Sequence, residues 1–252
     1  MRPSVTGQDA YSRTKSGCKD SRSPSLLKLC LLFAIVLASV SHAFAQQSDL
    51  EHVLGQMDSA AAKFRSAEAS FVWDHFQKVV EETDTQKGKI YFRRAGNQTE
   101  MLADISEPEA KSVLFTDSKI RLYQPKIDQV TVYDTGKNRE AFESFLVLGF
   151  GGGGHEMLKS FDVKYLAAEN LNGAETAKLE LVPKSVKVRN NVDHILLWID
   201  PARGVSAQQQ FFEPSGDYRL TKYSDFKLNE KISDSVFKLK TTGKTKTVSP
   251  QG

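Results

Sequence analysis

Hydrophobic side chains recur every three to four residues near the start of the chain, within residues 49–66. The apolar positions in this stretch are Leu50, Val53, Leu54, Met57, Ala61 and Phe64. This spacing puts them on one side of a helix, and Ser48 is a suitable cap ahead of Asp49 and Glu51. The sequence therefore predicts one amphipathic helix over residues 49–66.

After this helix the apolar positions alternate with polar ones, as Phe71, Trp73 and His75 show. Similar runs follow near residues 87–94, 99–105, 112–117, 119–124, 129–134, 161–169, 175–182, 193–200, 204–213 and 218–228. Turn residues separate several of these runs, including Pro108 and the Pro201–Gly204 segment. The pattern predicts about eleven short antiparallel strands joined by hairpins.

The alternation is interrupted at residues 138–160. Asn138 is placed to cap a helix from Arg139, whose apolar positions are Phe142, Phe145, Leu146 and Leu148. The run "GFGGGGHEML" follows, and we expect its four consecutive glycines to form a hinge between two helical pieces. Strands on both sides of a helical insert indicate a strongly curved antiparallel sheet with helices on its concave side.

The first 45 residues have the pattern of a secretory signal peptide. A basic region, residues 1–28, precedes an apolar run over residues 29–40 and a small-residue end at Ala43 and Ala45. The run is shorter than the ~20 residues of a membrane span, and Cys30 lies too early in it to be a lipoprotein anchor. We expect export to the periplasm, with cleavage after Ala45 and release in soluble form.

Removal of this leader changes the charge and the thiol content of the chain. The full chain carries 34 Lys and Arg against 31 Asp and Glu, and the leader takes six and two of them, which leaves 28 and 29. A nearly neutral domain gives no basis for nucleic-acid binding. Both cysteines, Cys18 and Cys30, also leave with the leader. We expect one monomeric domain over residues 46–240 and a flexible tail over residues 241–252.

The sequence contains no pattern that indicates catalysis. The histidines after the leader, His52, His75, His155 and His194, are isolated, and none has a second metal ligand three or four residues away. The glycine run lacks the Gly-Lys-Ser/Thr of a phosphate-binding loop, and no Gly-x-Ser-x-Gly motif is present. We therefore expect no enzyme activity, no cofactor and no metal.

Four stretches carry a resemblance to a known family. They are "GKIYFRR" (88–94), "VLFTDSKIRLYQPKIDQVTVYD" (113–134), "LELVPK" (179–184) and "SDFKLNEKISDSVFKLK" (224–240). In this order and spacing the chain resembles the periplasmic outer-membrane lipoprotein carrier (LolA) family. The resemblance implies an incomplete antiparallel barrel whose open concave side is plugged by helices.

The resemblance also implies a function and its partners. The chain would be a soluble periplasmic carrier that holds the acyl chains of lipoproteins in a lidded apolar cavity. It would receive them from an inner-membrane release complex and deliver them to an outer-membrane receptor. Two alternatives stay open: a carrier of another envelope lipid or glycolipid, and a sensor of such molecules that signals through a partner. The sensors usually have a second domain, which favours the carrier.

Arg94 is the residue to which the resemblance gives a role. It shares a strand face with Ile90 and Phe92, and in relatives the matching arginine is implicated in holding the lid closed. A guanidinium beside an apolar cavity needs partners, and backbone carbonyls of the lid would accept from its donors. The alternative is that Arg94, like Arg93, extends to water at the end of a strand.

Strand phase gives candidates for the cavity lining, each of which could instead be an ordinary core residue. From the strands they are Trp73, Ile90, Phe92, Leu102, Phe115, Leu122 and Val132, and from the lid Phe142, Phe145, Leu146 and Met157. The chain departs from the family at Ala95, where proline is usual, and at residues 97–105, which carry few aromatic side chains. These departures affect the expected cargo more than the fold.

Overall fold

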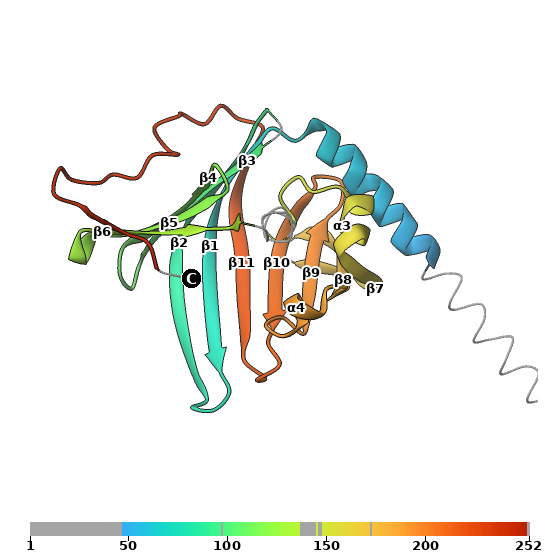
Figure 1. Ribbon diagram of the computed structural model, residues 1–252. Helices are drawn as coiled ribbons and strands as arrows, with labels where there is room; N and C mark the ends of the chain where they lie inside the picture. Colours follow the sequence, from blue (N-terminus) through green and yellow to red (C-terminus); the bar gives the residue numbers. More distant parts are fainter. Residues whose placement is uncertain (1–46, 97, 137–144, 146–147, 172, 251–252) are drawn as a thin grey trace, which may run out of the picture. The chain divides into compact units, whose positions relative to one another are not determined.

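A single twelve-stranded sheet forms the body of the chain within residues 45–252 (Figure 1). The structure is a computed structural model that describes residues 47–250 except 97, 137–144, 146–147 and 172. The strands are β1 (Ser66–Gln77), β2 (Glu82–Ala95), β3 (Gln98–Glu107), β4 (Lys111–Thr116), β5 (Lys119–Gln124), β6 (Gln129–Asp134), β7 (Phe161–Leu171), β8 (Ala174–Pro183), β9 (His194–Asp200), β10 (Val205–Phe212), β11 (Tyr218–Leu228) and β12 (Lys246–Val248).

The strand order is β12-β6-β5-β4-β3-β2-β1-β11-β10-β9-β8-β7, so the sheet has two free edges and is not closed. All neighbours pair antiparallel except β12 with β6, which are parallel. Hairpins join most neighbours, but β1 lies beside β11, at the centre of the order. The incomplete antiparallel barrel expected from the sequence is confirmed, with twelve strands in place of about eleven.

Three short helical segments with described bounds accompany a longer N-terminal helix. The N-terminal helix covers the described residues 47–63. The short segments are η1 (Pro125–Ile127), α3 (Gly154–Ser160) and α4 (Val186–Arg189). None of the helices in the described part of the chain is long and apolar enough to cross a membrane.

The N-terminal helix ends three residues earlier than predicted. The backbone N–H of Arg65 donates to the Asn229 side chain at 2.7 Å, and the Ser66 hydroxyl donates to the Glu230 carbonyl at 2.5 Å. These contacts draw residues 65–66 away from the helix and into β1. The apolar stripe of the helix is as predicted, because Val53, Leu54 and Met57 are all buried.

One face of the sheet, here called the inner face, carries the N-terminal helix and α3. Strand pairing places Leu179, Leu197, Gln209, Thr221 and Trp73 in one row across this face, from β8 to β1. Val53, Leu54 and Met57 of the helix and Met157 of α3 pack on the β7–β9 end of the inner face, against fully buried Leu179, Leu181, Ile195, Leu197 and Ile199. The helices therefore cover only part of the sheet.

The opposite, outer face is covered near β3 by the C-terminal segment. Phe237 packs with Leu102 and Leu114, and Ile232, Val236 and Leu239 lie around them. The chain then reaches β6, where residues 246–248 form β12 and the hydroxyls of Thr242 and Thr245 each donate to the Asp128 carboxylate at 2.6 Å. Residues 241–252 were predicted to form a flexible tail; in the structure these hydrogen bonds and β12 attach residues 242–248 to the edge of the sheet.

Candidate functional site

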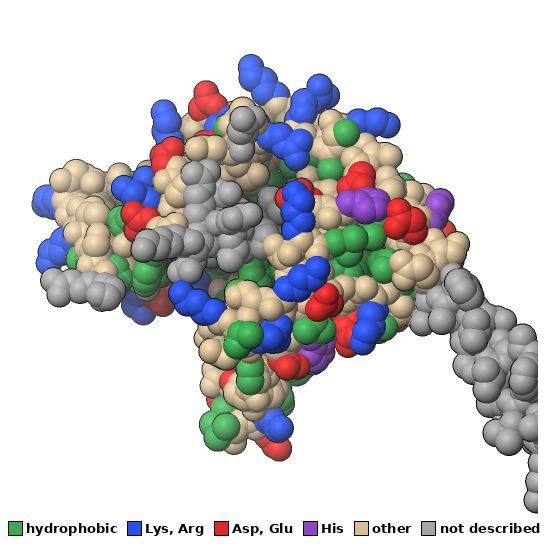
Figure 2. Space-filling view, turned by 45° about the vertical axis from the view of Figure 1, so that its right-hand side comes forward, with side chains coloured by type: hydrophobic (Ala, Val, Ile, Leu, Met, Phe, Trp, Pro, Cys, Tyr) green, Lys and Arg blue, Asp and Glu red, His purple; other side chains and the backbone are tan. Residues whose placement is uncertain are grey.

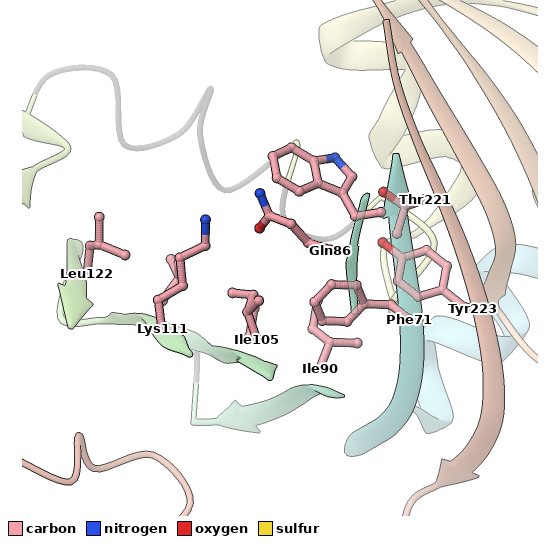
Figure 3. A pocket seen from close by; sticks show the side chains of 11 residues that line it. Phe71, Gln86, Ile90, Ile105, Lys111, Leu122, Thr221 and Tyr223 are labelled. Atoms are coloured by element: carbon pink, nitrogen blue, oxygen red, sulfur yellow. The ribbon is translucent and has the colours of Figure 1, made fainter. Parts of the chain in front are cut away.

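The inner face holds an apolar cavity of about 350 Å³ beside the part that the helices cover. Its walls come from β1 to β5 and from β11 (Figure 3). The lining residues are Phe71, Trp73, Gln86, Ile90, Ala103, Ile105, Lys111, Val113, Leu122, Thr221 and Tyr223. Most of these side chains are apolar or aromatic, and a cavity of this size is at the lower end of the ~300–1,000 Å³ typical of small-molecule sites.

The cavity exists because neighbouring strands turn apolar side chains to the same face at a place that the described helices do not cover. Ile90 lies across from Ala103, and Val113 lies across from Leu122 in the strand pairing. Tyr223 closes the β11 side of the cavity and donates a hydrogen bond to the Gln209 side chain at 3.3 Å. Burial raises the pKa of the Tyr223 hydroxyl well above its usual value, so this wall is neutral at physiological pH.

An aromatic plug closes one end of the cavity. Phe150 stacks on Phe92 with a centroid distance of 4.1 Å and meets Tyr223 edge-on at 5.0 Å. Phe64, from just after the N-terminal helix, joins the same buried cluster together with Met101 and Phe115. Ile90, Ala103 and Tyr223 belong both to the border of this cluster and to the cavity wall. Phe64 and Phe150 therefore separate the cavity from the apolar surface around Phe92 and Phe115.

Arg94 connects the two segments that carry this plug. Its guanidinium donates to the Ala61 carbonyl at 3.1 Å and to the Gly151 carbonyl at 3.1 Å. Ala61 lies at the end of the N-terminal helix, three residues before Phe64, and Gly151 directly follows Phe150. The side chain thus has backbone partners in both covering segments, which is the arrangement that a latch would require.

The neighbouring Arg93 points to the outer face. It makes an ion pair with Glu100 at 2.6 Å and another with Asp234, and it lies over the Phe237 ring at 4.4 Å. The sequence predicted that Arg93 extends to water at the end of a strand, and it did not predict these partners. Its partners come from the C-terminal segment, whose position the sequence pattern did not predict.

The glycine run packs tightly against the covering helix. A Cβ on Gly151 would overlap the Phe64 ring, and a Cβ on Gly154 would overlap backbone atoms of Leu54. Gly151 also has a φ of +76°, which favours glycine. These contacts give the run a packing role that the hinge interpretation did not include.

The predicted lining residues divide into four groups. Trp73, Ile90 and Leu122 line the cavity. Four others form a second group that packs in the interior: Phe92 and Phe115 lie on the same face under the plug, and Phe145 and Met157 belong to the core beneath the N-terminal helix. Phe142 and Leu146, like the predicted helix start at Asn138, lie outside the described residues.

Leu102 and Val132 form the fourth group and were assigned to the wrong face. Leu102 pairs with Tyr91, and Val132 pairs with Arg121, so both belong to the outer face. The error at Leu102 has a physical cause: β3 is buried on both faces, so its apolar residues 101–103 do not alternate with polar ones. A shift of one residue would have found Ile105, which lines the cavity.

Gln86 and Lys111 line the cavity and were missed, because polar residues were not considered as wall residues. Phe71 and Val113 were also missed, although each has the same phase as a predicted neighbour.

The described residues contain no group of three or more His, Cys, Asp or Glu side chains that could hold a metal ion. The site is thus apolar, with a few polar groups, and its geometry is that of a binding site.

An open antiparallel sheet with helices on its inner face and an apolar cavity beside them defines a carrier-type, ligand-binding half-barrel. The family comparison gives the particular class. The model of the family "Outer membrane lipoprotein carrier protein LolA" matches residues 62–240, and the chain belongs to this family. A comparison with curated proteins gave no match.

Solved structures share the fold at low sequence identity. An uncharacterized conserved protein from Thermus thermophilus is 11% identical with a TM-score of 0.51, over 79% of this chain and 98% of that one. MucB is 10% identical with a TM-score of 0.50, over 76% of this chain, and the chain spans only 63% of the length of MucB. At these identities the likeness shows the fold alone.

Proposed function

We propose that this protein is a periplasmic carrier that holds the acyl chains of lipoproteins, or of a related envelope amphiphile, in the inner-face cavity and releases them to an outer-membrane acceptor. The observation that carries the proposal is the apolar cavity of about 350 Å³ beside the aromatic plug. Arg94 donates hydrogen bonds to the two segments that carry this plug. Each buried methylene group contributes roughly 0.8 kcal/mol, so a cavity of this kind binds chains without any specific chemistry.

Opening of the plug would enlarge the cavity. Phe64 and Phe150 stand between the present cavity and the apolar surface of Phe92 and Phe115. If both segments moved away together, this surface would join the wall formed by Ile90 and Tyr223. A cargo with several acyl chains would need this larger space, whereas a single chain would need less of it.

Arg94 would set the free-energy difference between the closed and open states. Its two hydrogen bonds reach Ala61 and Gly151 in the two covering segments, so they would break if these segments moved away from Arg94. Cargo that opens the plug must break them, which lowers the net affinity. A carrier needs such an opposing contribution, because several buried acyl chains would otherwise bind too tightly for release.

The first experiment identifies the cargo. The full chain, expressed with its own leader and purified without detergent from a bacterial periplasm, is analysed by mass spectrometry for bound molecules. Acylated lipoproteins in stoichiometric amounts are expected. Phospholipid or glycolipid would move the function to lipid transport, and an empty protein that binds no fluorescent acyl probe would contradict the carrier proposal and favour the sensor alternative.

The second experiment tests the latch. Arg94→Leu removes both hydrogen bonds. Opening of the plug then no longer breaks them, so the open, loaded state becomes more stable relative to the closed state. We expect normal loading with an acyl probe and release to acceptor vesicles slowed by about tenfold, the equivalent of about 1.4 kcal/mol. Arg93→Leu is the matched control, because it removes the same charge from the outer face and should leave release unchanged. Equal release from wild type and Arg94→Leu would exclude the latch.

A further inference from the structure

Two polar side chains line the cavity on its β2–β4 side. They are Lys111, the first residue of β4, and Gln86 of β2. Figure 3 shows the Lys111 ammonium and the Gln86 amide projecting into the space on the same side of Ile105. The other walls are mostly apolar, with the hydroxyls of Thr221 and Tyr223 on the β11 side, so the cavity is amphipathic.

Lys111 has no charge partner in the described part of the chain, although carboxylates lie close to it in the sequence. Glu107 pairs with Lys87 at 3.0 Å, and Glu109 pairs with Lys126 at 2.9 Å. Lys111 itself forms no ion pair with any described carboxylate. It also lines a neighbouring surface groove with Glu109 and Lys126, so it lies at the rim of the cavity, where water still reaches the ammonium.

Gln86 lies deeper and is incompletely paired. Its Oε1 atom is buried and has no hydrogen-bond partner among the described residues. The Nε2 atom of the same amide makes no hydrogen bond with any described residue, and the amide projects into the cavity (Figure 3). This N–H group can therefore donate to an oxygen of the ligand.

We infer that the cavity binds an amphiphile whose anionic group, a carboxylate or a phosphate, pairs with Lys111 and Gln86 while its hydrocarbon chain lies against Ile105 and Ile90. An anionic oxygen accepts from the ammonium of Lys111 and from the amide N–H of Gln86. The inference rests on the proposed function, because it names the chemical class of cargo that this cavity takes in its closed state.

The test compares probes that share one chain and differ in the head group. Decanoate, decyl phosphate and the neutral methyl decanoate are titrated into the full-chain protein purified from the periplasm. Trp73 lines the cavity, so its emission reports entry of the chain, whereas the other tryptophan, Trp198, is hydrogen-bonded to Glu169 at 2.6 Å in another part of the sheet. We expect at least one of the anions to bind about tenfold more tightly than the ester.

Substitutions then assign this preference to the two residues. Lys111→Met keeps the length of the side chain and should weaken binding of the anion by about tenfold, with no change for the ester. Gln86→Met should weaken binding of the anionic probe by about threefold. Lys87→Met is the matched control: Lys87 is next to Gln86 but belongs to the outer face and pairs with Glu107, so both probes should bind as in the wild type.

The outcomes separate this inference from the carrier proposal. A preference for decanoate indicates a fatty-acid carboxylate, and one for decyl phosphate a phospholipid head group; both support the inference. Equal affinities for the anions and the ester, or equal effects of Lys111→Met and Lys87→Met, would overturn the inference and leave the apolar carrier cavity intact. A wild-type protein that binds none of the three probes would overturn both.

Discussion

The two ends of the inner face use similar strands but are filled in opposite ways. At the β7–β9 end, the N-terminal helix and α3 bury Leu179, Leu197 and their neighbours completely. At the β1–β5 end, apolar side chains of the same kind surround an empty volume of about 350 Å³. We call these the covered end and the hollow end. The comparison shows that the candidate site is the part of the inner face that the described helices do not fill.

The visible surface carries charges of both signs. Figure 2 shows Lys and Arg side chains interspersed with Asp and Glu, with Lys and Arg more frequent along the upper edge of the view. The exposed apolar residues include Val79 and Val80, which are 92% and 54% exposed in the turn between β1 and β2. The difference between the ends therefore lies in the packing of the interior, where the following predictions test it.

The largest expected effect is on the free energy of unfolding, when one leucine at each end is replaced by alanine. Leu197→Ala removes a fully buried side chain from the covered end and should lower the free energy of unfolding by about 3 kcal/mol. Leu122→Ala in the hollow end should cost less than about 1 kcal/mol, because Leu122 faces space that is already empty. Urea denaturation measures both. Equal losses would mean that the hollow end is as tightly packed as the covered one.

The second prediction concerns the contact between the glycine run and the helix. Alanine usually stabilises a helix relative to glycine, but a Cβ on Gly154 would meet backbone atoms of Leu54. Gly154→Ala should therefore lower the free energy of unfolding by about 2 kcal/mol. Gly55→Ala is the control, since nothing lies within 4 Å of its added Cβ, and it should stabilise by about 0.5–1 kcal/mol. Thermal unfolding of the two variants measures these changes. A gain of stability in both would contradict the close packing of Gly154 against Leu54.

The smallest effect is a pH dependence at the covered end. The His155 ring bonds to Asp58 and, at 3.0 Å, to Glu51, and so links α3 to the N-terminal helix. The hydrogen bond to Asp58 and then that to Glu51 raise the pKa of His155 above its ordinary value of 6.5. The stabilisation is therefore complete below about pH 6.5 and is lost as the pH rises through the raised pKa.

Calorimetry of wild type and His155→Gln tests this sign. The difference in Tm between the two proteins should be larger at about pH 5.5 than at about pH 9, where the wild-type imidazole is neutral. The neighbouring Glu156 is paired with Lys159 at 2.7 Å. A difference in Tm that is the same at both pH values would show that protonated His155 does not hold the two helices together.

Much of the fold could be predicted from local patterns. The stripe of Val53, Leu54 and Met57 has the helical period, and Ile90 and Phe92 have the strand period, so both elements were recognised. Arg94 could be placed on the inner face because its strand is polar on the other side. Where both faces of a strand are buried, as at Leu102, the alternation disappears and with it the information about orientation.

Other features depend on segments that are far apart in the sequence. Nothing near Gly154 indicates that Leu54 lies against it, and nothing near Asp128 indicates that Thr242 and Thr245 bind it. The empty volume is a further example, because it results from how far the N-terminal helix extends across the sheet. Lys111 and Gln86 are ordinary strand residues until that volume places them on the wall of a cavity.

The sequence by itself determined the N-terminal helix, most of the strands with their approximate bounds, and the family, because hydrophobic period and turn chemistry act over a few residues; it did not predict β12. Only the tertiary structure decided which face of each strand is covered, where the core stays hollow and which carbonyls accept from Arg94. The physical reason is that burial is a property of the assembled layers: a side chain such as Leu122 becomes core or cavity wall according to what another part of the chain places above it.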